Sequence, residues 1–196
     1  MKILHLSDTH GCHRRLGDLP EADVVVHSGD FCMVGSEREA IDFLDWLCDL
    51  PHRHKIFICG NHDECLYGAT ISEPGPGVHY LCNSGIEIDG ISFYGVPMFL
   101  HDSLSGRQAK HLSALPSGTD VVITHTPPHG ILDFADGINY GSPVLSARLG
   151  TVKPRLHLFG HIHACHGIVT IDGTTYSNGA VMAGGDAINE MNVLEI

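Results

Sequence analysis

Five short apolar runs in this chain each lead into a cluster of histidine, aspartate or asparagine residues. The runs and the polar residues behind them are 2–6 before Asp8 and His10, 23–27 before Asp30, 55–59 before Asn61 and His62, 120–123 before His125, and 156–159 before His161 and His163. Apolar runs of this length are typical of buried β-strands. Because ligands of open α/β sheets bind beyond the carboxyl ends of the strands, we expect the five clusters to meet at one site.

The composition limits the class of protein. The chain has 196 residues, 43% of them hydrophobic and 17% charged, which is enough for one folded domain over residues 1–196. The formal net charge of −12 opposes binding to nucleic acid or to an anionic membrane, because like charges repel. We therefore expect a small substrate, with neither a nucleic acid nor a membrane as partner, and leave the oligomeric state open.

The cysteine pattern favours a reducing compartment. The chain has seven cysteines, an odd number without a Cys-x-x-Cys pair, and it is too long for a small disulfide scaffold. Its first residues enter a predicted strand at once, without the basic and long apolar segments of a signal peptide. No apolar stretch is long enough to span a membrane. We expect reduced thiols and a cytoplasmic protein.

Helical patterns occur at three places. Ser36 and Glu39 have the spacing of a capping box, which predicts a helix over 36–50 that ends before Pro51. A weaker pattern covers 105–115, and another runs over 142–149 with proline in its first turn.

Strand patterns fill much of the remaining chain. Alternating runs around Asp-Gly turns predict hairpins over 85–96 and 167–177, next to strands over 78–81 and 191–196. We therefore expect an α/β fold, a two-sheet β-sandwich flanked by helices. The long loop over 127–141 is either functional or simply a flexible surface loop.

The side chains behind the apolar runs favour a metal centre. The candidate ligands are Asp8, His10, Asp30, Asn61, His125, His161 and His163. Mixed oxygen and nitrogen ligands without a thiolate suit Mn, Fe or Zn better than a structural zinc or a calcium site. Seven ligands are too many for one tetrahedral ion, so we expect two divalent ions that share a bridging carboxylate, manganese first, with Fe, Zn or Mg as alternatives. Such a pair, about 3.5–4 Å apart, suits an in-line displacement.

A charge count links this centre to phosphate esters. Two divalent ions, the carboxylates of Asp8 and Asp30 and a bridging hydroxide leave about one positive charge, which attracts an anionic phosphate. His62, between Asn61 and Asp63, can protonate the leaving oxygen or stabilise the transition state. Its alternatives are a role as a further ligand or as a more distant packing residue.

These motifs resemble those of the calcineurin-like metallophosphoesterase superfamily, above all its small metallophosphoesterase-domain-containing proteins and their bacterial relatives. The matching segments are 8–10, 29–30, 60–63, 124–128 and 153–163. The resemblance implies a two-sheet sandwich flanked by helices. It also implies that Asp8, His10 and His163 hold one ion, that Asn61, His125 and His161 hold the other, that Asp30 bridges both, and that His62 acts on the phosphate or the leaving group.

One position departs from the family pattern. Protein phosphatases of this superfamily have a second aspartate three residues after the position of Asp30, where it orients the catalytic histidine, and this chain has Met33 there. The departure weakens a phosphoprotein phosphatase assignment, and it leaves His62 to be oriented by Asp63 or by another group. We expect a phosphodiesterase that acts on small nucleotide-type diesters by metal-bridged hydroxide attack. The alternatives are a phosphomonoesterase with the same site and a non-catalytic scaffold with this fold.

Further residues close to the motifs have two interpretations each. Arg14, Arg15 and Arg148 either clamp a phosphate or lie in solvent, and we favour solvent for each of them. Asn178 either supports the site or forms a turn with the glycine that follows it.

Overall fold

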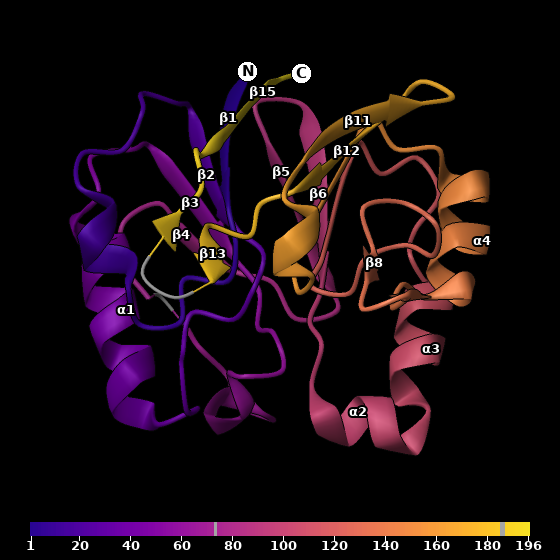
Figure 1. The fold of residues 1–196 in the computed structure, drawn as a ribbon. Helices are drawn as coiled ribbons and strands as arrows, with labels where there is room; N and C mark the ends of the chain where they lie inside the picture. Colours follow the sequence, from indigo (N-terminus) through magenta and orange to yellow (C-terminus); the bar gives the residue numbers. More distant parts are fainter. Residues whose placement is uncertain (73, 185–186) are drawn as a thin grey trace.

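Two β-sheets pack face to face in this chain, and helices cover both outer faces (Figure 1). The computed structural model describes residues 1–72, 74–184 and 187–196. The α/β sandwich expected from the sequence is confirmed. The carboxyl ends of the parallel strands of both sheets lie at one edge, where the loops with the polar clusters begin.

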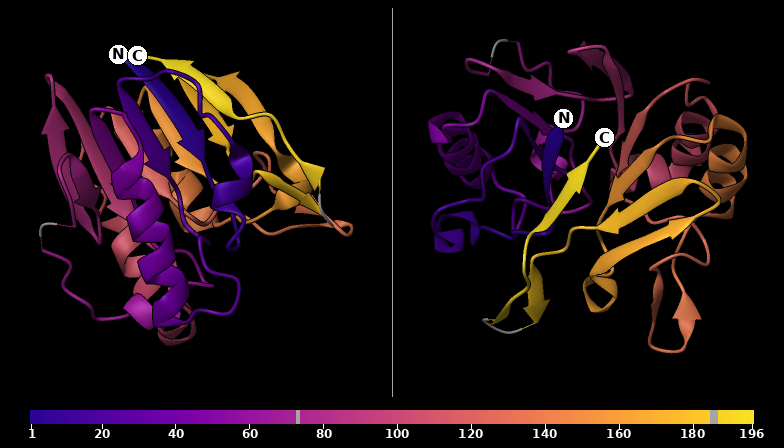
Figure 2. Two further views of the ribbon diagram at one scale, coloured as in Figure 1. Left: turned by 90° about the vertical axis from the view of Figure 1, so that its left-hand side faces the viewer. Right: turned by 90° about the horizontal axis from the view of Figure 1, so that it is seen from above.

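The first sheet has the strand order β15-β1-β2-β3-β4. Its strands are β1 (Lys2–Leu6), β2 (Val24–His27), β3 (His54–Phe57), β4 (Val78–Tyr80) and β15 (Asn192–Glu195). The strands β1 to β4 are parallel, whereas β15 runs antiparallel to β1. The two chain termini therefore lie side by side, as Figure 2 shows from above.

The second sheet has the order β11-β12-β10-β7-β6-β5. Its strands are β5 (Ser84–Ile88), β6 (Ile91–Val96), β7 (Val121–Thr124), β10 (Leu156–Phe159), β11 (Gly167–Ile171) and β12 (Thr174–Asn178). The central strands are parallel, and hairpins add an antiparallel strand at each edge.

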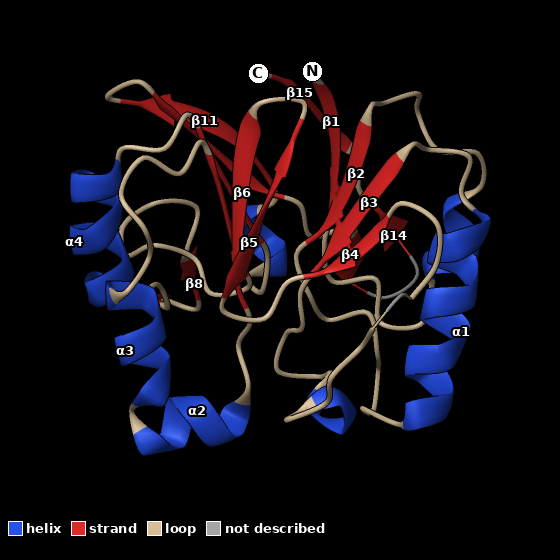
Figure 3. Ribbon diagram, turned by 180° about the vertical axis from the view of Figure 1, so that it is seen from behind, coloured by secondary structure: helices blue, strands red, loops and turns tan. Residues whose placement is uncertain are grey.

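Alternation along the strands builds three apolar layers. Between the sheets lie Ile3, Val24, Val26, Ile56, Ile58, Val121, Ile123, Leu156 and Leu158. The outer face of the first sheet packs against α1 (Glu37–Asp49), and that of the second packs against α3 (Arg107–Ser113) and α4 (Pro143–Val152) (Figure 3). Successive strand residues point to opposite faces, so each strand contributes to two layers.

The start of α1 follows its sequence signal. The Ser36 hydroxyl accepts from the Glu39 N–H, and the Glu39 carboxylate accepts from the Ser36 N–H, so the predicted capping box is confirmed. Leu50 is extended at the helix end, as expected for a residue before proline.

Other predicted boundaries were wrong. The helix predicted over 105–115 is the shorter α3, and a second helix, α2 (Leu100–Ser105), precedes it without having been predicted; Gly106 separates the two with φ 74°. The predicted helix over 142–149 continues to Val152. The predicted loop over 127–141 contains a hairpin of β8 (Phe134–Ala135) and β9 (Ile138–Asn139). The small pair β13 (Met182–Gly184) and β14 (Ala187–Ile188) had no clear sequence signal. In the described part of the chain, no helix has the length and apolarity needed to cross a membrane.

Two buried histidines support the outer faces of the sheets. The Nε2 of His27 lies 3.0 Å from the Thr9 hydroxyl, with its ring against Phe43. The Nε2 of His157 lies 2.9 Å from the Thr124 hydroxyl. Burial lowers the pKa of each imidazole to about 3, so both rings are neutral in the folded protein.

Protonation of His157 at acidic pH should therefore destabilise the folded protein. The pKa of His157 is near 6.5 in the unfolded chain and about 3 in the fold. Below pH 6.5 the unfolded chain therefore binds a proton that the folded protein does not, and the free energy of unfolding falls as the pH drops. Between pH 7.5 and 5.0, the free energy of unfolding of the wild type should fall by about 2 kcal/mol more than that of His157→Gln. Urea unfolding at both pH values measures this difference, and equal pH dependence would contradict it.

Candidate metal centre

The loops behind the strands hold the candidate ligands on an unusual backbone. Asp8, His10, Asp30 and His161 all have positive φ, at 55°, 42°, 58° and 73°. Left-handed conformations are uncommon for residues with a side chain and cost about 1–3 kcal/mol each where they are enforced. Such backbone strain is concentrated at functional sites in proteins.

Main-chain hydrogen bonds fix the first two loops to one another. The Asp8 N–H donates to the Gly29 carbonyl at 2.9 Å, and the His10 N–H donates to the Asp30 carbonyl at 3.0 Å. Space is tight at this contact, because a Cβ on Gly29 would lie 2.6 Å from the Gly60 nitrogen. A side chain at Gly29 would therefore separate the second loop from the third.

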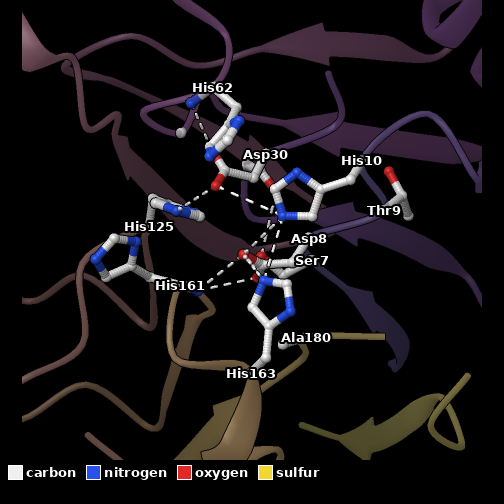
Figure 4. Close-up of polar contacts among 12 residues, drawn as sticks. Ser7, Asp8, Thr9, His10, Asp30, His62, His125, His161, His163 and Ala180 are labelled. Atoms are coloured by element: carbon white, nitrogen blue, oxygen red, sulfur yellow. Dashed lines mark hydrogen bonds and ion pairs between the residues drawn. The ribbon is translucent and has the colours of Figure 1, made fainter. Parts of the chain in front are cut away.

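The side chains converge in two adjoining groups (Figure 4). One group is Asp8, His10 and His163, and the other is Asp30, His125 and His161. Within each group, ligand atoms lie within 4.8 Å of one another. Asp30 also forms a group with His10 and His62, so its carboxylate lies between the two. The family resemblance implied the same grouping of these six residues, and Gly60, the neighbour of Asn61, packs directly on Asp30.

Hydrogen bonds at the far side of two rings fix where their protons lie. The His10 Nδ1 lies 3.1 Å from the Cys32 carbonyl, and the His125 Nδ1 lies 2.9 Å from the Ser28 carbonyl. A carbonyl only accepts, so each Nδ1 carries the hydrogen and each Nε2 of the neutral ring presents a lone pair.

The Nε2 atoms of these two rings lie close to other polar atoms of the cluster. The His125 Nε2 lies 3.3 Å from the Asp30 Oδ2, and the His10 Nε2 lies 3.2 Å from the His163 Nε2. The Asn61 Oδ1 and the His125 Nε2 are buried without a hydrogen-bond partner among the described residues. A buried polar atom without a partner is costly, and a cation bound at the cluster would satisfy both of these atoms. The donor set therefore fits divalent metal ions.

The pKa shifts of the clustered residues also favour a positive charge at this place. Burial alone would lower the pKa of His125, but the carboxylates of Asp30 and Asp8 raise it to about 10. Burial, with His125 next to it, lowers the pKa of His161 to about 4. Burial would raise the pKa of Asp8, but contact with His163 holds it well below its ordinary value. A positive charge at the cluster is thus strongly favoured by its surroundings.

Asp63 organises the loops without facing the cluster. Its buried carboxylate accepts from the main-chain N–H groups of Asp30 and Gly60 at 2.8 Å each, and of Cys32 at 2.9 Å. Burial, with Asp30 nearby, raises its pKa to about 7. One carboxylate thus joins the second loop to the third.

His62 is held by a main-chain oxygen. Its Nδ1 lies 2.7 Å from the carbonyl of Met33, so the suggestion that Asp63 orients this ring was wrong. The residue that replaces the aspartate of the protein phosphatases thus supplies the contact through its backbone. A sequence does not reveal such a contact, because every residue has a carbonyl.

The further residues considered from the sequence lie as follows. Arg14 pairs with Asp42, and the Arg148 guanidinium donates to the Leu115 carbonyl, so neither contacts the cluster. The Asn178 side chain donates to the Ile162 carbonyl at 2.9 Å and accepts from the Ala180 N–H at 3.1 Å. It therefore supports the loop between His161 and His163, as one of its two interpretations expected.

Comparison with known proteins agrees with the geometry. Residues 1–165 match the model of the calcineurin-like phosphoesterase family. UPF0046 protein C25E10.12 of Caenorhabditis elegans is 35% identical over 92% of this chain and 75% of its own length. Metallophosphoesterase domain-containing protein 1 of Homo sapiens is 30% identical over 92% of this chain and 66% of its own length.

Solved structures share the fold at low sequence identity. TT1561 of Thermus thermophilus aligns with a TM-score of 0.62 at 16% identity, over 91% of this chain and 88% of that chain. GAP50, described as the anchor in the inner membrane complex of Plasmodium, aligns with a TM-score of 0.55 at 12% identity, over 98% and 75%. The sequence match over most of the chain, on this fold and with these clustered motifs, shows that the chain belongs to the calcineurin-like phosphoesterase family.

Proposed function

We propose that the protein is a dinuclear metal-dependent phosphohydrolase that prefers small phosphodiesters. The observation that carries the proposal is the convergence of two carboxylates and four imidazoles in two adjoining groups, with ligand atoms within 4.8 Å of one another in each group, together with the buried and unpartnered Asn61 Oδ1 and His125 Nε2. Each group has one carboxylate and two imidazoles, which are enough protein ligands for one cation.

The ligand assignment follows the two groups. Asp8, His10 and His163 would hold one ion, and Asn61, His125 and His161 the other. Asp30 would serve both, since its Oδ2 lies 3.3 Å from the His125 Nε2 and 3.9 Å from the His10 Nε2. Manganese is the first choice for such a set of imidazole and oxygen ligands, with Fe, Zn or Mg as alternatives.

The metal ions and His62 would have separate roles in the reaction. Two divalent ions, when bound, stabilise charge on the phosphate oxygens and acidify water at neutral pH. The His62 Nδ1–H donates to the Met33 carbonyl, so in the imidazolium form the ring also carries a proton on Nε2, which it can deliver to the departing ester oxygen and become neutral. The His62 N–H also donates to the Asp30 Oδ1 at 2.8 Å, so the same residue fixes the shared carboxylate.

Two features support a diester over a monoester. A monoester carries one more negative charge, and two of the candidate clamps, Arg14 and Arg148, are engaged elsewhere. Met33, whose carbonyl contacts the His62 ring, and Val34 after it have apolar side chains that are 50% and 80% exposed. They suit contact with a second organic group of the substrate.

Hydrolysis assays test the proposal. Protein loaded with Mn²⁺ should bind two ions per chain by elemental analysis, and it should hydrolyse bis(4-nitrophenyl) phosphate faster than 4-nitrophenyl phosphate. His62→Ala should keep both ions and lose about 10²–10⁴-fold in kcat on the diester, because it removes the proton donor. Faster turnover of the monoester would favour the phosphomonoesterase alternative.

Asp30→Asn serves as the metal control. It should lose one or both ions together with activity, because an amide does not provide a bridging carboxylate. A wild type that binds ions but cleaves neither ester would favour the non-catalytic scaffold, and one that binds no ion would overturn the proposal.

Asp63 should matter for metal binding without contact to the metals. Asp63→Asn replaces one acceptor oxygen by an amide that faces a main-chain N–H, so the free energy of unfolding should fall by about 2–3 kcal/mol. The affinity for Mn²⁺ should fall too, because the loops of Asp30 and Asn61 separate. Urea unfolding and calorimetric titration at pH 8 measure both effects.

Asp133→Asn is the matched control. Asp133 is also buried, but a single oxygen accepts both main-chain N–H groups, of Gly130 at 3.0 Å and Gly141 at 2.9 Å. An asparagine keeps that oxygen, so stability and Mn²⁺ affinity should stay close to the wild type. Equal losses in the two variants would contradict a specific role of Asp63.

A further inference from the structure

A buried histidine lies behind the candidate metal centre without belonging to it. His5 is on β1, is fully buried, and connects the two sheets. Its Nδ1 lies 2.8 Å from the Ser177 hydroxyl on β12, and its Nε2 lies 2.9 Å from the Ser28 hydroxyl directly after β2. The proposed chemistry does not use this residue.

The hydrogen bonds around His5 have a direction. The Asn192 amide donates to the Ser177 hydroxyl at 2.8 Å. That hydroxyl can in turn donate to the His5 Nδ1, and the ring hydrogen then lies on Nε2. In this tautomer the His5 Nε2–H donates to the Ser28 hydroxyl.

Ser28 connects this chain of bonds to a candidate ligand. Its main-chain carbonyl accepts from the His125 Nδ1–H at 2.9 Å, and its own N–H donates to the Leu6 carbonyl at 2.9 Å. One residue thus offers its hydroxyl to His5 and its carbonyl to His125. The direction of the His125 ring depends on where Ser28 lies.

The surroundings allow the His5 ring little freedom. A Cβ on Gly179 would lie 2.7 Å from the His5 Cε1, so the backbone of this residue packs directly against the ring. Burial lowers the pKa of His5 to about 3, and the neutral ring keeps one donor and one acceptor.

We infer that His5 is a positioning residue for His125, acting through Ser28, and that it sets the affinity of the second metal group. The inference rests on the proposed function, since it concerns the ion that Asn61, His125 and His161 would hold. Partners that orient a metal-binding histidine typically contribute 10–100-fold to metal affinity. The competing explanation is that His5 only ties the two sheets together.

Two substitutions separate these roles. The amide of a glutamine reaches the place of the imidazole Nε2, so His5→Gln can keep the bond to Ser28. The amide of an asparagine reaches only the place of Nδ1, so His5→Asn can keep the bond to Ser177 and loses the one to Ser28. The tie between the sheets is the bond from His5 to Ser177, which His5→Asn can keep and His5→Gln loses, so a pure tie predicts the opposite order of effects in the two variants.

The experiment is a titration of metal-free protein with Mn²⁺, followed by calorimetry and by the electron paramagnetic resonance signal of the coupled ion pair. His5→Asn and Ser28→Ala should bind one ion 10–100-fold more weakly and lose the coupled signal at limiting Mn²⁺. His5→Gln should stay within about threefold of the wild type. Ser177→Ala, which cuts the far end of the chain of bonds, should also keep its affinity.

Urea unfolding of the metal-free variants provides the structural control. Losses of metal affinity that follow the losses of stability across all four variants would overturn the inference, as would wild-type affinity in His5→Asn and Ser28→Ala. Equal affinities of His5→Gln and His5→Asn would overturn it as well. A wild type that binds no Mn²⁺ would instead refute the proposed function, so the two failures are distinguishable.

Discussion

The gathering of two carboxylates and four imidazoles in one cluster is the constraint on which this structure depends. The Nε2 atoms of His10 and His163 lie 3.2 Å apart, and the His125 Nε2 lies 3.3 Å from the Asp30 carboxylate. Polar groups this close need a proton or a metal ion between them, so the chain holds them in place by bonds made elsewhere. Carbonyls of Cys32 and Ser28 fix the far sides of two rings, and Asp63 fixes the loops beneath them.

The apolar layers of the sandwich offset the free-energy cost of building such a site. Parallel strands of both sheets end at the same edge, so loops distant in sequence start side by side and need few residues to meet. Four of the candidate ligands have left-handed backbone, and several are buried polar groups. The apolar layer between the sheets and the layers under the helices offset that cost, because they bury large side chains over most of the chain.

The sequence predicts the parts of this arrangement that depend on side-chain type and spacing. The capping box at Ser36, the buried strands and the convergence of Asp8, His10, Asp30 and the later histidines all have such signals, although the metal roles themselves remain predictions. The hinge at Gly106 and the partners of His62 have none. A glycine has many uses in a helical segment, and the Met33 carbonyl is independent of the methionine side chain. His5 could not be told from other strand residues, because its partners, Ser28 after β2 and Ser177 on β12, are distant in sequence.

The Met33 contact shows how backbone can replace a charged side chain at little electrostatic cost. A carboxylate at that position would orient His62, but it would also add a negative charge beside Asp8 and Asp30. The neutral carbonyl fixes the same ring at 2.7 Å and leaves the charge of the centre unchanged. With two divalent ions bound, the proposed centre would have about one net positive charge. One further carboxylate would neutralise that charge and with it the attraction for an anionic ester. The departure from the phosphatase pattern is therefore consistent with a working site built differently, rather than with a degraded one.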